Sequence, residues 1–207
     1  MIGTLNTGAW KRKGWLAAIF ATAFMTAPAN AAFHQWSLTE LYSNASGTLQ
    51  FIEMQTPAGP GGDNQQFLSG QHITVANVGN TLSNTYNVTT NSGSPTGGHF
   101  LLFGTAGLAA AGGPAPDYII PNGFLFTAGG SVSYFGNGGS YTPLAYTALP
   151  TDGFLSRTWA GGNALNSPTN FAGQSSPVPE PTTLVLAPLA FGAMHLVRRR
   201  RSNAAAL

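Results

Sequence analysis

The sequence contains no cysteine and very few charged residues. With zero cysteines among 207 residues, the chain has no disulfide framework, no thiol nucleophile and no thiolate metal ligand. Asp, Glu, Lys and Arg make up 7% of the sequence, against about 25% in average soluble proteins, which excludes a coiled coil or a charged helical bundle. Because 43% of the residues are hydrophobic and 11% are aromatic, disorder of the highly charged kind is excluded as well.

Basic residues are almost missing from the central part of the chain. Between residues 32 and 177 the one basic residue is Arg157. The same stretch holds five acidic residues, which are Glu40, Glu53, Asp63, Asp117 and Asp152. One positive charge minus five negative charges leaves this part at about −4, although the whole chain carries +2. Nucleic-acid binding requires cations clustered on a folded face, so we expect no nucleic-acid partner.

The first 31 residues follow the order of a secretory signal peptide. A basic segment at residues 11–13 precedes an apolar run over residues 15–25, and the small residues Ala29 and Ala31 follow. The run is short for a membrane span. We therefore predict that residues 1–31 are a signal peptide, removed by signal peptidase after Ala31. The alternative is an uncleaved anchor helix, and both place the body outside the cytoplasm.

The C-terminal part combines an extended tetrapeptide, an apolar segment and a basic cluster. The tetrapeptide consists of Val178, Pro179, Glu180 and Pro181. Its prolines fix φ and remove backbone donors, so we expect an extended, accessible segment. Residues 182–197 are apolar and marginal in length for a bilayer core of about 30 Å. Four basic residues follow, namely Arg198, Arg199, Arg200 and Arg201, and positive charge of this kind stays on the cytoplasmic side.

This order of motif, apolar segment and arginine cluster resembles the PEP-CTERM sorting signal. The resemblance implies that residues 178–181 are recognised by an exosortase-like sorting enzyme and that residues 198–201 are a membrane stop. It also implies a biofilm-forming Gram-negative host and an association with extracellular polysaccharide. The protein would then be held transiently in the inner membrane before it reaches the cell surface or the extracellular space. A plain C-terminal membrane anchor is the alternative.

Short apolar or alternating runs separated by Gly, Asn and Pro predict an all-β body. The first two runs, residues 36–42 and 48–54, flank a turn at residues 44–47 and predict a hairpin. Alternation places Phe51 and Glu53 on one face of the second strand and Ile52 on the other. Further strands are expected over residues 72–75, 85–88, 99–103, 131–135, 144–146 and 154–159.

A second hairpin is predicted where Asn122-Gly123 lies between two apolar runs, residues 117–120 and 124–126. Both turn residues tolerate φ > 0, which a tight hairpin turn requires. Eight to ten strands at this spacing predict an antiparallel β-sandwich, which we place as one domain over residues 32–160. Residues 161–177 are polar and lack periodicity, so we predict a flexible linker there, followed by the sorting signal over residues 178–207.

The body also resembles a second known family. Residues 38–44 and 50–54 resemble the opening of a lamin-tail-type immunoglobulin-like domain, and residues 99–103 resemble one of its inner strands. The resemblance implies an immunoglobulin-like sandwich, here flanked by an N-terminal signal helix and a C-terminal transmembrane helix. It implies no particular activity.

The acidic residues of the body offer few candidate sites. Glu40 and Glu53 lie on the two strands of the first predicted hairpin, where paired carboxylates could perform acid–base chemistry or hold Ca²⁺. The alternative is that they face solvent or form hydrogen bonds at the sheet end. The remaining polar candidates lack the alternating acidic spacing of a Ca²⁺ loop and are interpreted as turn formers; these are Asp63, Asn64, Asp117 and Asp152.

The histidines and aromatic residues show no site pattern. His34, His72 and His99 lack the close spacing of a zinc site, and no Gly-x-Ser-x-Gly nucleophile elbow is present. Several aromatic side chains could stack on sugars, although core packing explains most of them; these are Trp36, Tyr118, Tyr134, Tyr141 and Trp159. Glycosylation sequons begin at Asn44 and Asn87. We therefore predict no catalytic residue, no metal site and no cofactor.

Together these patterns favour a non-enzymatic, exported protein of the cell surface or extracellular matrix that is sorted through its C-terminal signal. Two alternatives remain open. One is a secreted hydrolase or Ca²⁺-dependent enzyme that uses Glu40, Glu53 or Asp117. The other is a membrane-anchored structural domain that keeps its tail.

Overall fold

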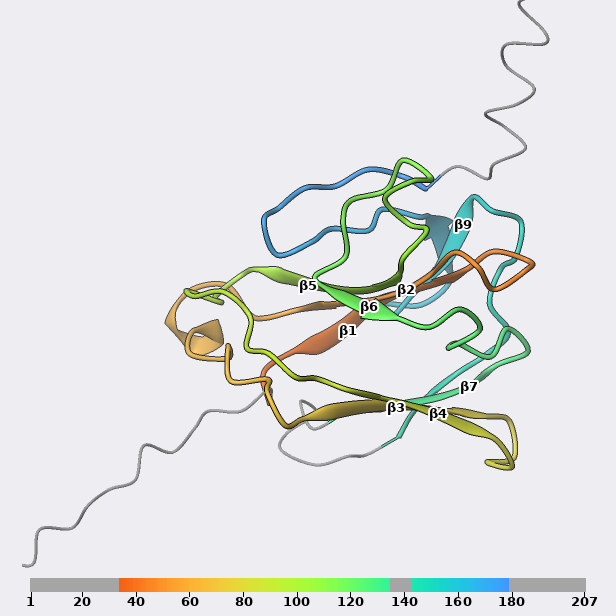
Figure 1. The fold of residues 1–207 in the computed structure, drawn as a ribbon, viewed down its shortest axis with the longest axis horizontal. Helices are drawn as coiled ribbons and strands as arrows, with labels where there is room; N and C mark the ends of the chain where they lie inside the picture. Colours follow the sequence, from red (N-terminus) through yellow and green to blue (C-terminus); the bar gives the residue numbers. More distant parts are fainter. Residues whose placement is uncertain (1–33, 135–142, 179–207) are drawn as a thin grey trace, which may run out of the picture.

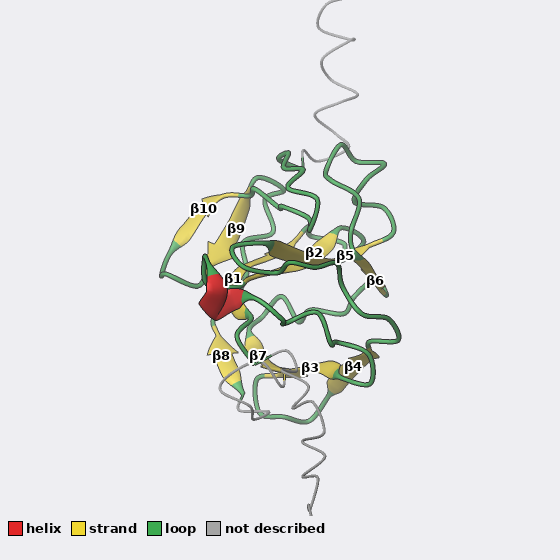
Figure 2. Cartoon of the chain, turned by 90° about the vertical axis from the view of Figure 1, so that its left-hand side faces the viewer, coloured by secondary structure: helices red, strands yellow, loops and turns green. Residues whose placement is uncertain are grey.

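Two β-sheets lie face to face in the protein. The computed structural model describes residues 34–134 and 143–178, and Figures 1 and 2 show the two sheets as separate layers. The larger sheet has six strands in the order β10-β9-β1-β2-β5-β6, and the smaller has four in the order β4-β3-β7-β8. The two layers confirm the predicted all-β sandwich.

The strand bounds follow the apolar and alternating runs of the sequence. The six-stranded sheet contains β1 (Ser37–Ser43), β2 (Gln50–Gln55), β5 (Phe100–Thr105), β6 (Tyr118–Ile120), β9 (Leu155–Thr158) and β10 (Asn163–Leu165). The four-stranded sheet contains β3 (His72–Asn77), β4 (Ser83–Asn87), β7 (Gly130–Tyr134) and β8 (Leu144–Tyr146). A short 3₁₀ helix, η1 (Pro60–Gly62), lies in the glycine-rich loop between β2 and β3.

The first predicted hairpin is present as β1 and β2. Leu41 pairs with Ile52, and Tyr42 pairs with Phe51, so successive pairs point to opposite faces of the sheet. Ile52 belongs to the core between the two sheets, whereas Phe51 belongs to a separate cluster on the outer face. The alternation predicted for this strand is therefore confirmed.

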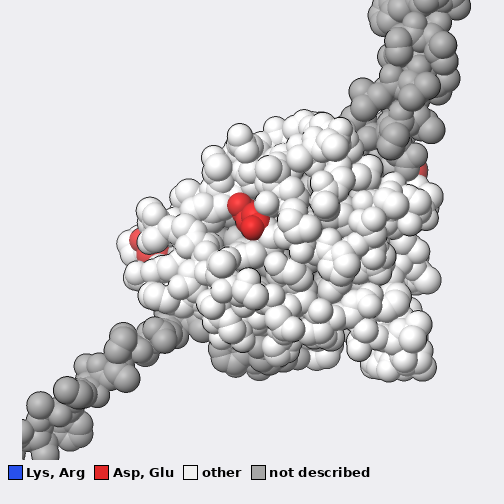
Figure 3. Space-filling model, viewed as in Figure 1, with Lys and Arg blue, Asp and Glu red and all other residues white. Residues whose placement is uncertain are grey.

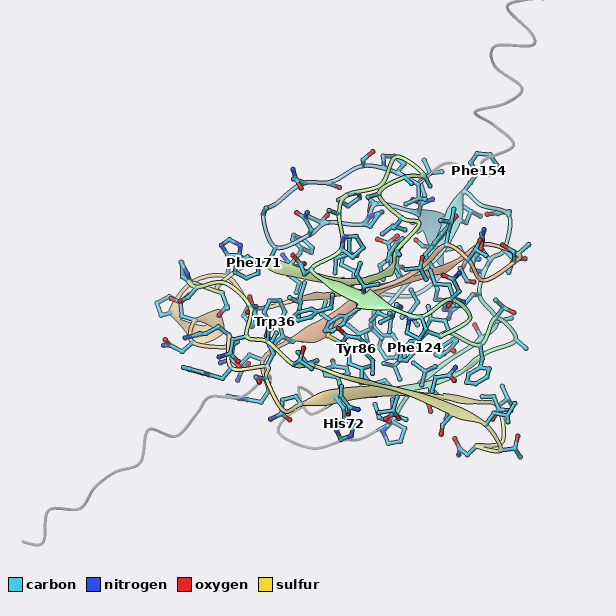
Figure 4. All side chains as sticks on the ribbon, viewed as in Figure 1. Trp36, His72, Tyr86, Phe124, Phe154 and Phe171 are labelled. Carbon is cyan, nitrogen blue, oxygen red and sulfur yellow. The ribbon has the colours of Figure 1, made fainter. Side chains whose placement is uncertain are left out.

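The main core fills the space between the two sheets. Its largest fully buried side chains include Trp36, Phe103, Phe124 and Tyr134, and Figure 4 shows Trp36 and Phe124 between the layers. The indole Nε1 of Trp36 donates to the Gln65 carbonyl oxygen at 3.0 Å. This buried aromatic side chain thus keeps its polar group satisfied, as a stable core requires.

A smaller apolar cluster covers the outer face of the six-stranded sheet. It consists of Tyr42, Leu49, Phe51, Leu102, Leu108, Ala111 and Val178. The rings of Tyr42 and Phe51 stack with centroids 5.2 Å apart. Figure 1 shows that chain segments without regular structure, residues 106–117 and 166–178, lie over this face. The outer face is therefore covered by two loops.

The prediction of a hairpin around Asn122-Gly123 is wrong. β6 pairs with β5 in parallel, and residues 124–126 form no strand. A parallel pair needs a long crossover connection, and residues 106–117 provide one across the outer face.

Side chains take the hydrogen-bonding groups that a strand at residues 124–126 would have offered. Gln50 Nε2 donates to the Leu125 carbonyl oxygen at 3.0 Å, and Gln50 Oε1 accepts from the Leu125 N–H at 3.0 Å. Asn84 Nδ2 donates to the Phe124 carbonyl oxygen at 2.9 Å. The turn at Gly123, with φ of 72°, therefore forms without a paired strand after it.

The predicted flexible linker over residues 161–177 is also wrong. Residues 163–165 form β10, in which Leu165 pairs with Leu155 of β9. The residues that follow lie against the outer face, and Val178 is fully buried there. The folded domain therefore continues to Val178, beyond the predicted boundary at residue 160.

The predicted signal peptide and most of the predicted sorting signal lie outside the described residues. This applies to Ala29 and Ala31, to Pro179, Glu180 and Pro181, and to Arg198, Arg199, Arg200 and Arg201. Among residues 34–134 and 143–178, no helix is long and apolar enough to cross a membrane.

Candidate functional site

Two buried carboxylates lie side by side on the outer face of the six-stranded sheet. Glu40 of β1 and Glu53 of β2 are direct partners in the antiparallel register, and their side chains are 5% and 4% exposed. The register shifts between Leu38 and Glu40, which places Thr39 at a β-bulge, a feature that redirects side chains. The Thr39 hydroxyl donates to Glu53 Oε1 at 2.6 Å. The two candidate residues from the sequence are therefore brought together.

The carboxylates hold residues 166–178, which we call the C-terminal strap. The Ser167 N–H donates to Glu40 Oε1 at 3.0 Å, and the Thr169 N–H donates to Glu53 Oε2 at 2.7 Å. Pro168 lies between these donors, and a residue that precedes proline is restricted to extended backbone. In an extended chain the N–H groups of alternate residues point the same way. The N–H groups of Ser167 and Thr169 therefore both point at the sheet and reach carboxylates on the neighbouring strands β1 and β2.

Asp117 continues this pattern at the next alternate residue of the strap. Its Oδ2 accepts from the Phe171 N–H at 2.9 Å and from the Leu102 N–H at 2.8 Å. The Asp117 N–H in turn donates to the Leu102 carbonyl oxygen at 2.9 Å. Three carboxylates, from β1, from β2 and from the end of the crossover loop, thus accept backbone hydrogen bonds from Ser167, Thr169 and Phe171 of the strap.

Asparagine side chains close the strap on itself. The Val178 N–H donates to Asn166 Oδ1 at 2.6 Å, and Asn166 Nδ2 donates to the carbonyl oxygens of Val178 and Phe154 at 3.2 and 2.9 Å. Asn170 Nδ2 donates to Gln174 Oε1 at 2.8 Å and to the Ala115 carbonyl oxygen at 3.0 Å. The first and last residues of the strap are therefore joined, and its middle is tied to the crossover loop.

Burial raises the pKa of both glutamates. Burial raises the pKa of Glu53 to about 7, and the neighbouring Glu40 charge adds to this rise, while hydrogen bonds from Thr39 and Thr169 oppose it. Burial also raises the pKa of Glu40, against hydrogen bonds from Ser156 and Ser167. Like charges held close together disfavour ionisation of the second group. At neutral pH the pair therefore carries less than its full charge of −2.

The arrangement of Glu40 and Glu53 serves attachment of the strap. Three of their four oxygens accept hydrogen bonds from strap backbone groups or from Thr39, and Glu40 Oε2 accepts from the Ser167 hydroxyl at 3.3 Å. Among the described residues, no group of three His, Asp or Glu side chains is close enough to hold a metal ion. The hydrogen-bonding alternative considered for this pair is the one observed.

A cavity of about 200 Å³ lies beside the strap at Asp117. It is lined by residues 90–93 together with Leu101, Tyr118 and Phe171. The Tyr118 hydroxyl donates to the Thr90 carbonyl oxygen at 3.0 Å. A Cβ on Gly93 would lie 2.4 Å from the Phe171 ring, so a glycine is needed for this close approach. The cavity combines aromatic rings with a carboxylate, which suits a small polar ligand.

Phe171, which is labelled in Figure 4, lines this cavity and is held by His99. Its ring stacks on His99 with centroids 4.5 Å apart, and its carbonyl oxygen lies 3.0 Å from His99 Nδ1. His99 therefore holds an aromatic residue in place. The other two candidate histidines lie elsewhere, His34 at the start of the described chain and His72 at the start of β3.

The interpretation of the other polar candidates as turn formers is only partly right. It is wrong for Asp117, whose carboxylate binds the N–H groups of the distant residues Leu102 and Phe171. Asp63 Oδ1 accepts from the Gly97 N–H at 2.9 Å, and Asn64 has φ of 62°, in the left-handed region that asparagine tolerates. Asp152 Oδ1 accepts from the N–H groups of Phe154 and Leu155 at 2.9 and 2.8 Å. The side chain of Asp152 thus fixes local backbone geometry, as predicted, whereas that of Asp63 connects its turn to a loop 34 residues further along the chain.

The aromatic candidates and the asparagines of the two sequons differ in how far they are buried. Trp36 and Tyr134 are buried in the main core, and Trp159 is partly exposed after β9. Tyr141 lies outside the described residues. Asn44 is buried and its Oδ1 accepts from the Leu49 N–H at 3.1 Å, whereas Asn87 is exposed at the end of β4. The sequon at Asn44 is thus not accessible in the folded domain.

Sequence reasoning missed Asn166, Asn170 and the bulged Thr39, and it misplaced Val178. We expected Val178 to belong to an accessible tetrapeptide, but its side chain is buried in the outer cluster. The one usable signal was Ser167-Pro168, which predicts extended backbone. Nothing local shows that its N–H groups would meet carboxylates 116 and 127 residues earlier in the chain.

Comparison with protein-family models, with curated proteins and with solved structures found no match to this chain.

Proposed function

We propose that the protein is an exported, non-enzymatic module of the cell surface or extracellular matrix, sorted through a PEP-type signal that begins where the folded domain ends. The observation that supports this is the position of Val178. It is buried and held through both its N–H and its carbonyl by Asn166, and Pro179-Glu180-Pro181 follows directly. A sorting enzyme would thus meet the motif at a fixed distance from the domain.

Surface charge supports a partner that is itself uncharged. The face in Figure 3 is almost free of charged side chains, and residues 32–177 contain one basic residue. Long-range electrostatic attraction therefore contributes little to any encounter. We propose that the partner is a neutral extracellular polysaccharide, and that the cavity at Asp117 and Phe171 accepts one of its sugar units.

The body is proposed to be an immunoglobulin-like domain of the lamin-tail type. The β1–β2 hairpin and the inner strand β5 fall on the residues that carry that resemblance. A sandwich of this kind presents loops and edges for binding. The resemblance therefore agrees with a binding or structural role.

Intact-mass spectrometry tests the sorting proposal. We expect protein from the surface or medium to start near Ala32 and to end close to residues 178–181. Replacing Pro179, Glu180 and Pro181 by alanine should leave a membrane-bound chain that still ends at Leu207, whereas the matched control Ser175→Ala should be processed normally. If the wild-type chain keeps Leu207 and is found only in membranes, the protein is a membrane-anchored structural domain instead.

Affinity chromatography on the host's own polysaccharide tests the partner. We expect the folded protein to be retained and Gly93→Ala, which pushes against the Phe171 ring, to elute earlier. Gly61→Ala is the control, because Gly61 is also a loop glycine, a Cβ there meets nothing within 4 Å, and its φ does not lie in the left-handed region. Turnover of the polysaccharide that is lost in Glu53→Gln would favour the hydrolase alternative.

A further inference from the structure

The end of the domain at which the described chain stops is apolar and almost free of charge. Phe154 and Leu165 are 49% and 72% exposed. Asn166 connects them to Val178, because it follows Leu165 and its Nδ2 donates to the carbonyl oxygens of both Phe154 and Val178. Figure 4 shows Phe154 beside the point where the described chain ends.

The crossover loop also packs against Val178. Leu108 and Ala111 pack in one cluster with Val178, and the Ser176 hydroxyl donates to the Gly112 carbonyl oxygen at 2.9 Å. Ala109 and Ala110, which lie between Leu108 and Ala111 in the sequence, are exposed. Residues 105–116 include no charged residue. Exposed apolar side chains gathered on one surface mark an interaction site.

Two charged residues, one acidic and one basic, lie near this surface. Asp152 is exposed, and its Oδ1 is occupied by the N–H groups of Phe154 and Leu155. Arg157 lies two residues beyond Leu155 on β9. Because one acidic and one basic residue offset each other, the surface has little net charge, which is compatible with a zwitterionic partner.

Covalent geometry limits how far this surface can lie from the apolar segment that follows. Thr182 is four residues from Val178, and an extended chain spans at most about 3.6 Å per residue, so Thr182 lies within about 14 Å of Val178. Because Val178 is fixed in the domain, any membrane entered by residues 182–197 must lie close to Phe154, Leu165 and Ala109.

We infer that this exit surface, formed by Phe154, Leu165, Ala109 and Ala110, rests on the lipid bilayer while the tail is inserted. The inference depends on the proposed function, in which residues 182–197 enter the membrane. Phenylalanine and leucine are side chains that interfacial protein surfaces bury at the boundary between headgroups and acyl chains. The contact orients the domain with its six-stranded sheet edge β9–β10 toward the lipid.

Site-specific fluorescence in vesicles tests this contact. The chain has no cysteine, so Phe154→Cys, Leu165→Cys and Leu82→Cys each carry one bimane label. Leu82 is the matched control, because it is 62% exposed and lies in the turn between β3 and β4 of the other sheet. The tail-bearing chain is reconstituted into phosphatidylcholine vesicles with or without nitroxide-labelled phosphatidylcholine. We expect several-fold stronger quenching at positions 154 and 165 than at position 82.

The same samples separate this inference from the proposed function. Resistance of the protein to alkaline carbonate extraction reports insertion of the tail, and circular dichroism reports folding of each variant. If the chain resists extraction but all three labels are quenched equally, or position 82 is quenched most, the membrane contact of the exit surface is wrong. If carbonate releases the chain, insertion of the tail itself is wrong.

Discussion

The two faces of the six-stranded sheet are stabilised in different ways. The inner face packs large side chains such as Phe103 and Ile52 against the second sheet. The outer face combines a small apolar cluster with Glu40 and Glu53, which accept hydrogen bonds from the strap. Apolar burial is non-directional, whereas a hydrogen bond requires defined distances and angles. The inner face therefore supplies most of the stability, and the outer face determines where the C-terminal end of the domain lies.

The largest expected effect comes from removing a ring on the inner face. Phe103 is fully buried, stacks on Tyr118 at 4.9 Å and meets Tyr86 edge-on at 6.0 Å. We expect Phe103→Ala to lower the free energy of unfolding by about 3–5 kcal/mol. Phe51→Ala on the outer face should cost less, because loops can collapse into the cavity. Urea unfolding of both variants measures the difference, and an equal loss would contradict this comparison.

The second effect is a dependence of stability on pH that originates at Glu53. Because its pKa is raised from 4.5 to about 7, the folded protein keeps a proton that the unfolded chain has released between these values. The contribution of Glu53 to stability is therefore fully present below pH 4.5 and is lost as the pH rises through about 7, which amounts to up to roughly 3 kcal/mol.

The variant Glu53→Gln isolates this contribution. It keeps the shape and an oxygen for the Thr169 N–H but cannot ionise, so its unfolding free energy should vary much less between pH 5 and pH 8. Chemical unfolding at a series of pH values measures both proteins. A slope in Glu53→Gln equal to that of the wild type would assign the pH dependence to other groups.

A third, smaller effect is expected at the joined ends of the strap. Asn166→Ala removes the bonds to both backbone groups of Val178 and should cost about 1–3 kcal/mol. Hydrogen exchange should increase at Ser167, Thr169 and Val178 more than in β2. Asn163→Ala, on the exposed strand β10, is the control and should change little. Exchange that increases throughout the domain would contradict a local role.

The smallest effect should appear where a side chain of β4 binds the loop that follows β6. Asn84 of β4 donates to the carbonyl oxygens of Gly123 and Phe124 at 3.2 and 2.9 Å. Because this contact is partly exposed, Asn84→Ala should lower stability by about 0.5–1.5 kcal/mol. Thermal unfolding measures it, with Ser83→Ala at the exposed start of the same strand as the control. A loss larger than that of Asn166→Ala would reverse the proposed order.

Local patterns predicted much of the sandwich because they have local causes. The β1–β2 hairpin follows from alternation and from a turn at residues 44–47, and β3, β5 and β7 follow from short apolar runs. The parallel position of β6 could not be predicted, because it depends on a distant partner, β5. The hairpin predicted after Asn122-Gly123 failed because Gln50 and Asn84 bind the backbone that a strand would have used.

The candidate site was predicted only in part, for a related reason. The pairing of Glu40 with Glu53 follows from the hairpin. The strap appeared to be a linker because its polar residues have no periodicity, yet its stability comes from backbone groups that bind remote carboxylates. Burial of Val178 likewise depends on Leu108 and Leu102, which are far away in the sequence.

The long separation between the glutamates and the strap has a consequence for the timing of folding. Glu40 and Ser167 are 127 residues apart, and Glu53 and Thr169 are 116 residues apart. Contacts between residues so far apart in the sequence form late in folding, because closing the large loop between them costs conformational entropy first. A chain that emerges N-terminus first presents both carboxylates long before their partners arrive. The domain is therefore complete only after residue 178 has emerged, so closure of the strap is among the last steps of folding.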